Sequence, residues 1–265
     1  MRELLVFTDG ARFASGCRFH LAGKTDIGLF PSLFTLQAWN LREKDYLLLA
    51  SAKTLEVRRG DSCLALGKVT DVFRRTVPEG TVTVAAFSPG LELWEAPVSL
   101  SVEAGASVSD TVRGILAASG TGVPLLSFPG EDPVLSRGQA YCGRTADCLA
   151  EALSAAGARC VLVPAGLCVV PAIPLQATLQ LTEQDLQDAP MFAAGGKKMI
   201  LSTKVTGFRP GETMTLEWKG NTYEGLILER MTDADTTMGS WRTQLLVASR
   251  NGWQRQESVG TEMLL

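Results

Sequence analysis

The sequence is poor in the residue types on which most catalytic and metal sites depend. His20 is the only histidine among 265 residues, and the six cysteines include no C-x-x-C pair. A Ser-His-Asp or Cys-His arrangement would have to use His20, yet no G-x-S-x-G motif is present and nothing near Cys17 resembles a nucleophile signature. Zinc would need four ligands from cysteines without paired spacing. We therefore predict that the chain is not an enzyme and has no catalytic, cofactor-binding or metal-binding residues.

An excess of positive charge and long apolar runs are also missing. The chain has 25 Lys and Arg against 28 Asp and Glu, so no basic surplus favours nucleic acid. No apolar run approaches the roughly 18 residues that span a bilayer, and the first residues lack the pattern of a signal peptide. These features predict a cytoplasmic protein without a membrane anchor and without sequence-specific nucleic-acid binding. They also predict reduced thiols at Cys17, Cys63, Cys142, Cys148, Cys160 and Cys168.

A D-x-D motif in the segment "ERMTDADTTMGSW" is the first candidate for chemistry. Counting from Asp233 and Asp235, a calcium loop would need its glycine one place earlier and a glutamate where Gln244 stands. Aspartate and glycine are also the residues that tight turns require. We therefore predict the polar tip of a hairpin at this place and no metal loop.

Two further acidic pairs could in principle act as the two carboxyl groups of a glycosidase. They are Glu92 with Glu95, next to Trp94 as a possible sugar platform, and Asp185 with Asp188. Solvated surface acids are the simpler interpretation of both pairs. Exposed tryptophans could instead mark an interface, and the candidates for this role are Trp39 and Trp253.

The sequence does contain abundant strand signals at both ends. In "SLFTLQAWN", alternation places Phe34, Leu36 and Ala38 on one face of a strand. Short strands separated by tight turns favour antiparallel meanders that close into small barrels. We therefore predict a first β-barrel module at residues 1–97 and a second at residues 173–253. In the second, "LTEQD" predicts a helical turn capped by Thr182, "KGN" predicts a hairpin turn with positive φ at Gly220 and Asn221, and residues 254–265 form a C-terminal tail.

The intervening residues 98–172 have the pattern of an α+β module. Ser107 is expected to cap one helix, which ends at Gly120, and Thr145 to cap a second helix, which ends at Gly157. "ARCVLVPAGLCVVPA" then predicts two buried strands about a turn. The predicted fold class is thus α+β and mainly β, with two small antiparallel β-barrel modules flanking an α+β module.

Four segments carry a resemblance to a known family. The initial strand and following loop of that family are similar to "SLFTLQAWNLREKDYLLL", and its long hairpin is similar to "VRRGDSCLALGKVTDVFRRTVPEGTVTVAAFS". Its central helix-strand units resemble "SVEAGASVSDTVRGILAASG" and "GRTADCLAEALSAAGARCVLVPAGLCVVPA". Its closing barrel resembles "FRPGETMTLEWKGNTYEGLILERMTDADTTMGSWRTQLLVA". In this order, the chain resembles the baseplate hub proteins of contractile-tailed phages and related injection systems, including the late control protein D family and the hub of phage Mu.

The resemblance implies a structural role in a virion. It implies a homotrimer whose two related barrels per subunit form a ring, which adapts a six-fold tail tube to a three-fold spike and surrounds the DNA passage. The implied partners are other copies of the chain, the tail tube protein, the spike protein and the tape measure protein. The implied location is the tail baseplate, assembled in the cytoplasm of the bacterial host. We expect no cell-wall cleavage, because no lysozyme-like or peptidase-like segment follows the last strand.

Two other functions stay open at this point. The chain could be an enzyme acting on peptidoglycan or another polysaccharide through an acidic pair such as Glu92 and Glu95. It could also be a β-rich binding module for peptides or carbohydrates that is unrelated to phage tails.

Overall fold

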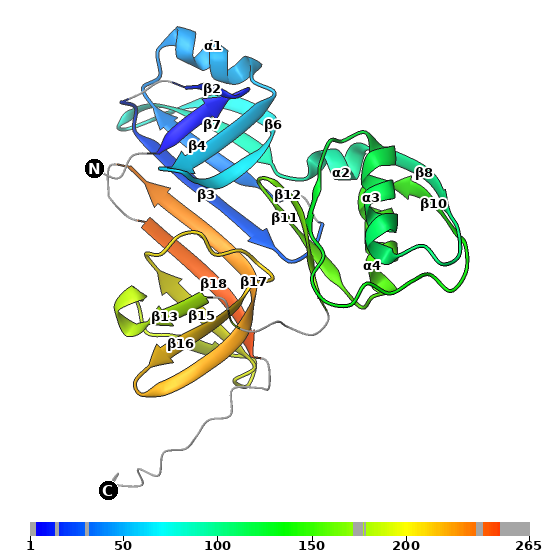
Figure 1. Ribbon diagram of the computed structural model, residues 1–265. Helices are drawn as coiled ribbons and strands as arrows, with labels where there is room; N and C mark the ends of the chain where they lie inside the picture. The colour runs from blue at the N-terminus through cyan, green and yellow to red at the C-terminus, as the bar shows by residue number, and fades with distance from the viewer. Residues whose placement is uncertain are drawn as a thin grey trace, which may run out of the picture.

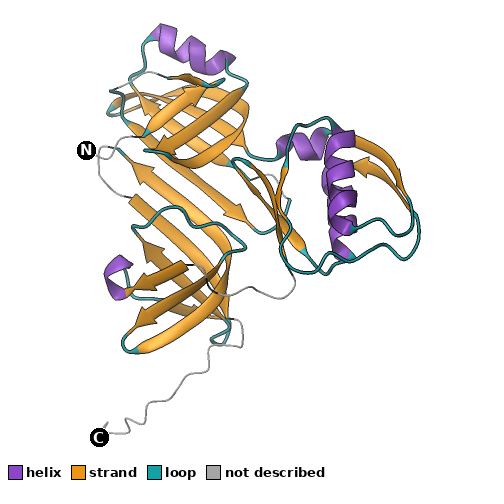
Figure 2. Cartoon of the chain, in the orientation of Figure 1, coloured by secondary structure: helices purple, strands orange, loops and turns teal. Residues whose placement is uncertain are grey.

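The computed structural model describes residues 4–13, 16–29, 32–171, 177, 179–236 and 241–249. Most of these residues lie in strands and a minority lie in four α-helices, which confirms the predicted α+β, mainly β class. Figure 1 shows two β-rich parts that meet along the long strands β3 (Phe19–Asp26) and β17 (Asn221–Asp235), with a third, helix-containing part beside them. Figure 2 shows how the helices concentrate in this third part. Within the described residues, no helix has the length and apolar character needed to cross a membrane.

The first β part is an antiparallel arrangement with one helix. Its order is β1 (Leu5–Thr8), β2 (Ala11–Arg12), β3, β4 (Phe34–Trp39), α1 (Glu43–Ser51), β5 (Thr54–Arg59), β6 (Ser62–Val77) and β7 (Gly80–Ser88). The alternation predicted for β4 is confirmed, since Phe34, Leu36 and Ala38 are buried while the residues between them are half-buried. Alternation of this kind follows from the two-residue period of a strand.

Helix α1 replaces the loop that we expected after β4. Glu43 and Asp45 lie in its first turn, where negative charge is favourable. The Arg42 Nε donates to Asp45 Oδ2 at 2.8 Å, and Leu49 is fully buried in the first core. The run "YLLL" hides this helix from a periodicity analysis, because its other two leucines, Leu47 and Leu48, are exposed. Besides Leu49, contacts of Arg74 of β6 with Glu43 and with the ring of Tyr46 hold the helix in place.

The α+β part contains the two helices and the two strands that we predicted, together with four elements that we did not predict. The additional elements are α2, β8, β9 and β10. The element order is α2 (Leu91–Glu95), β8 (Pro97–Val102), α3 (Val108–Ser119), β9 (Leu125–Ser127), β10 (Gln139–Arg144), α4 (Thr145–Ser154), β11 (Arg159–Val163) and β12 (Gly166–Val170). Helix α3 has the predicted cap, because the Ser107 hydroxyl accepts a hydrogen bond from the amide of Asp110 at 3.1 Å. The prediction for α4 was wrong at both ends. Arg144 is the N-cap, and the Thr145 hydroxyl donates instead to the Ala96 carbonyl at 2.9 Å. The helix ends at Ser154, with Ala155 as its C-cap, and not at Gly157.

The last part returns to strands. It consists of β13 (Leu179–Thr182), the 3-10 turn η1 (Glu183–Asp185), β14 (Met191–Ala193), β15 (Lys198–Thr203), β16 (Thr213–Trp218), β17 and β18 (Trp241–Ser249). The predicted capping of η1 by Thr182 is confirmed, with Asp185 as its reciprocal partner. The β16–β17 hairpin has the expected tight turn, but its positive φ angles fall on Lys219 and Gly220, while Asn221 already pairs with Trp218.

Strand β17 joins the two β parts into one thirteen-stranded sheet. One edge of β17 pairs with β18. Its other edge pairs first with β16, over residues 221–226, and then with β3, over residues 229–235. The change of partner coincides with a bulge at Leu228, where the β17–β18 register shifts.

The hydrophobic cores are also shared between parts of the chain. Three large clusters of buried apolar residues lie in the first β part, the α+β part and the last part. The first cluster also contains Ala234 and Trp241, which come from the last two strands of the chain. The first core is therefore completed by residues that the sequence places in the second β module. No strand pair within the described ranges closes either β part into a ring, so closed barrels stay a prediction.

Candidate functional site

Asp233 and Asp235 lie in β17, opposite Ala22 and His20 of β3, and not at the tip of a hairpin as predicted. Asp233 Oδ1 is 2.8 Å from His20 Nε2, and Asp235 Oδ2 accepts from Arg18 at 3.1 Å. Both carboxylates therefore link the end of β17 to the start of β3 and to Arg18, the residue before this strand. Residues 237–240, where the predicted tip falls, lie outside the described residues. In the described part of the chain, no three His, Cys, Asp or Glu side chains could together hold a metal ion.

The candidate pair Glu92 and Glu95 lies on the short helix α2. Glu95 pairs with Lys68 of β6 at 2.6 Å, and both side chains are about half exposed. Trp94, the possible sugar platform, is covered by the guanidinium of Arg144 at 4.5 Å from its ring centroid. The arrangement attaches α2 to its neighbours and covers one face of the Trp94 ring, and the two glutamates lie on one short helix and not across a cleft from each other.

The second acidic pair is also engaged in local structure. Asp185 accepts a hydrogen bond from the Thr182 amide at 2.9 Å, which caps the turn η1. Asp188 pairs with Arg242 of β18 at 3.1 Å. Since the two carboxylates serve different partners, they do not face a common cleft as a glycosidase pair would.

The cysteines described by the structure are free thiols. Burial raises the pKa of Cys17, and the nearby charge of Asp45 adds to the effect. Burial also raises the pKa of Cys160 to about 12, and burial together with the charge of Glu56 raises that of Cys63 to about 12. Because the thiolate is the nucleophile, these three thiols are poor nucleophiles at neutral pH.

The two tryptophans considered as interface anchors are Trp39 and Trp253. Trp39 is half-buried, and the guanidinium of Arg18 lies 4.2 Å from its ring centroid. One face of this ring is therefore already covered within the subunit. Trp253 lies outside the described residues.

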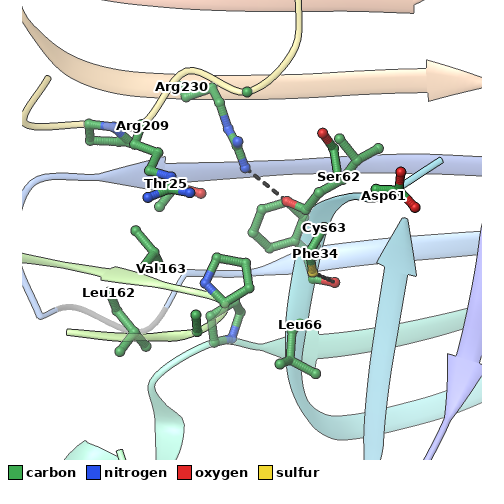
Figure 3. A pocket seen from close by; sticks show the side chains of 17 residues that line it. Thr25, Phe34, Asp61, Ser62, Cys63, Leu66, Leu162, Val163, Arg209 and Arg230 are labelled. Carbon is green, nitrogen blue, oxygen red and sulfur yellow. Dashed lines mark hydrogen bonds between the residues drawn. The ribbon is translucent and has the colours of Figure 1, made fainter. Parts of the chain in front are cut away.

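A cavity of about 330 Å³ lies where the three parts of the chain meet, and we call it the junction cavity. Its walls come from β3, β4, the start of β6, the turn between β11 and β12, the segment 207–210, and β17. Figure 3 shows Arg230 reaching from β17 toward the Ser62–Cys63 segment, with Arg209 beside it and Val163 across the space. The cavity thus collects residues that are far apart in the sequence.

Arg230 is the buried charge of this cavity, with only 9% of the residue exposed. Its Nη1 donates to the Phe208 carbonyl at 3.1 Å and its Nη2 to the Leu64 carbonyl at 2.8 Å. The guanidinium therefore bridges the last part of the chain and the first. Burial lowers the pKa of Arg230, because desolvation penalises the charged form.

Sequence analysis missed Arg230 because of the bulge at Leu228. Before the bulge, Gly225 and Ile227 are the buried residues of β17, and after it the buried positions have the other parity. One extra residue exchanges the two faces of a strand. A simple alternation would place Arg230 on the solvent side.

Open strand edges are the other functional feature. Strand β6 pairs with β5 only as far as Lys68, and beyond this residue its edge away from β7 has no strand partner among the described residues. This half of β6 carries Phe73, which is 45% exposed. At one end of the sheet, the edge strand β14 exposes Met191 and Phe192. Unpaired edges with exposed apolar residues are templates for contact with another chain.

No family model and no curated protein matches the chain. Solved structures do match it over nearly its whole length. A tail protein from Neisseria meningitidis MC58 has a TM-score of 0.72 at 10% identity, covering 94% of this chain and 97% of the other. A 43 kDa tail protein of prophage MuSo2 from Shewanella oneidensis has a TM-score of 0.69 at 12% identity, covering 95% and 98%.

A third match is a component of the E. coli type VI secretion system that is described as structurally similar to the phage T4 tail proteins gp27 and gp5. Its TM-score is 0.65 at 12% identity, covering 94% of this chain and 78% of the other. At such low identities the similarity establishes a common fold. The chain therefore shares its fold with a tail protein of Neisseria meningitidis, a prophage tail protein and a component of a type VI secretion system.

Proposed function

We propose that this chain is a structural component of a phage-type tail baseplate. In this proposal it is a homotrimeric hub that adapts a six-fold tail tube to a three-fold spike, surrounds the DNA passage and catalyses no reaction. Its partners are further copies of itself, the tail tube protein, the spike protein and the tape measure protein. It is assembled in the bacterial cytoplasm and resides in the virion tail.

The observation that carries the proposal is the match of nearly the whole chain to tail proteins. With 94% of this chain and 97% of the Neisseria tail protein covered, the match extends over the first β part, the α+β part and the last β part. A match to a single small barrel would be weak support, because such barrels serve many functions. We further propose that residues 1–97, 98–172 and 173–253 act as three domains and that residues 254–265, outside the described residues, form a tail that a partner orders.

The open edge of β6 supports assembly with further copies. Nine residues of this strand lie beyond Lys68, and Phe73 adds an exposed apolar side chain among them. Pairing of this edge with a neighbouring subunit would satisfy its backbone groups and cover the phenylalanine. Cyclic symmetry would then repeat the same contact at every subunit boundary.

Mass measurement in solution over a range of concentrations tests the proposal. We expect a trimer, alone or on addition of spike protein, and we expect Phe73→Glu to weaken it. Leu126→Glu is the matched control, because Leu126 is also 45% exposed but lies on β9 of the α+β part. A wild-type protein that is monomeric at every concentration, with spike and tube proteins present, would contradict the hub proposal.

The enzymatic alternative has a separate test. Zymography on bacterial cell walls would reveal a peptidoglycan-cleaving activity, and clearing that disappears in Glu95→Gln would support the alternative. We expect no clearing from the wild-type protein, because Glu95 pairs with Lys68 and lies on the same short helix as Glu92, not across a cleft from it.

A further inference from the structure

We propose that the junction cavity is a binding site for a small oxyanion, a carboxylate or a phosphate, held between Arg230 and Arg209. This inference is independent of the proposed assembly role, since it concerns a cavity within one subunit. It rests on the charge of the cavity, on its walls and on its size.

No ion pair neutralises the charge of Arg230 among the described residues. Its two hydrogen bonds go to the carbonyls of Leu64 and Phe208, which carry no net charge, and its buried Nε has no hydrogen-bond partner. No carboxylate in the described ranges forms an ion pair with it. A buried charge without a counterion is costly, so buried arginines are usually paired. An anion in the cavity would supply the missing partner.

Arg209 adds a second positive charge at the exposed side of the same cavity. Its proximity contributes to the lowered pKa of Arg230, as expected for two like charges that face one space. The charge of Glu212 opposes this lowering of the Arg230 pKa. Glu212 does not line the cavity, however, and its carboxylate accepts the backbone N–H of Arg209 at 2.8 Å. Asp61 is the one acid among the described lining residues, and no ion pair joins it to either arginine. The lining therefore has an excess of positive charge.

The rest of the cavity is suited to the body of a small molecule. Its other walls include the side chains of Phe34, Leu66 and Val163, which are apolar. A volume of about 330 Å³ is near the lower end of the range of ligand pockets. A guanidinium binds a carboxylate or phosphate through two parallel hydrogen bonds. The structure thus fits an oxyanion head next to the arginines, either as inorganic phosphate or as a carboxylate on a small apolar body.

Calorimetric titration with inorganic phosphate and with benzoate tests the site and distinguishes the two ligands. We expect at least one of them to bind the wild-type protein at millimolar or lower concentration. Removal of one guanidinium, in Arg209→Gln or Arg230→Met, should weaken binding roughly ten- to hundredfold, as expected for a charge-assisted hydrogen bond. Tighter binding of benzoate would indicate that the apolar walls contact the ligand. Tighter binding of phosphate would indicate that the ligand is an inorganic anion. Binding of neither probe would overturn the proposal.

Arg75→Gln is the matched control, because Arg75 is exposed on the outer half of β6 and does not line the cavity. This variant should bind as the wild type does, and equal losses in all three variants would refute the site. If Arg230→Met fails to fold, Arg209→Gln still tests anion binding, because Arg209 is exposed and its substitution should leave the fold intact. Thermal unfolding in phosphate gives a second measurement: general salt stabilisation is the same in every variant, whereas specific stabilisation should disappear in Arg209→Gln.

Discussion

Truncation of Trp241 is the sharpest test of how the two β parts are joined. Trp241 is the first residue of β18, yet it is 3% exposed and belongs to the hydrophobic cluster of the first β part. The guanidinium of Arg59, at the end of β5, lies 4.7 Å from its ring centroid. A residue from the end of the chain thus fills the core of its beginning. We expect Trp241→Ala to destabilise the first β part.

The size of the effect follows from burial. A buried indole removes about 150–250 Å² from water, which corresponds to about 4–6 kcal/mol at about 25 cal/mol per Å². Its buried Nε1–H has no hydrogen-bond partner, and removal of this unsatisfied donor returns about 1–3 kcal/mol. The cavity left behind adds to the loss, and measured Trp-to-Ala substitutions in cores cost about 3–5 kcal/mol. We expect a loss of about 3–5 kcal/mol in the free energy of unfolding.

Native-state hydrogen exchange assigns this loss to a part of the molecule. In Trp241→Ala, the free energy of opening at amides of β4 and β7, in the first β part, should fall by the same amount as the free energy of unfolding. Trp218→Ala is the control, because Trp218 packs against the cluster of the last part and should lower protection of β15 and β16 instead. Unchanged protection of β4 and β7 in Trp241→Ala, with a loss confined to the last part, would refute the shared core.

Three further predictions concern single sites. Gly23→Ala should destabilise the protein by about 1–3 kcal/mol in denaturant titrations, because a methyl group there would overlap the ring of Phe34, its cross-strand partner; a neutral effect would show that the ring can move. Ser107→Ala should lower stability by about 1 kcal/mol, since it removes the side-chain cap of α3, and Ser107→Asp should restore most of the loss. Alkylation at pH 8 followed by mass spectrometry should label the exposed Cys142 and spare Cys160 until the protein unfolds, since burial raises the Cys160 pKa to about 12. Because the unfolded thiol ionises first, stability should fall as pH rises from about 9 toward 12, and equal stability at both ends of this window would contradict the burial.

Local patterns were sufficient where the deciding interactions are local. The cap of α3 at Ser107, the capped turn at Thr182 and the buried face of β4 all depend on residues within a few positions of one another. Such features follow from side-chain period and capping, which act over one or two turns of the chain. The same locality explains why the order of the β, α+β and β parts could be predicted.

Long-range pairing decided the candidate site. None of the cavity could be predicted, because Arg230 faces inward only through the bulge at Leu228, and its partners at Leu64 and Phe208 come from other strands and loops. Helix α1 was missed for the same reason, since it is held by Leu49 in the first core and by contacts with Arg74 of β6, which is remote in the sequence.

The sequence by itself determined the class of fold, the main helices and the scarcity of catalytic residue types. Tertiary structure decided that β17 leaves one β part to pair with β3 of the other, which brings Asp235 opposite His20 across more than two hundred residues. The physical reason is that strand pairing is selected by the burial and backbone hydrogen bonds of the whole sheet. Those terms depend on which surfaces meet in space, and no window of neighbouring residues contains them.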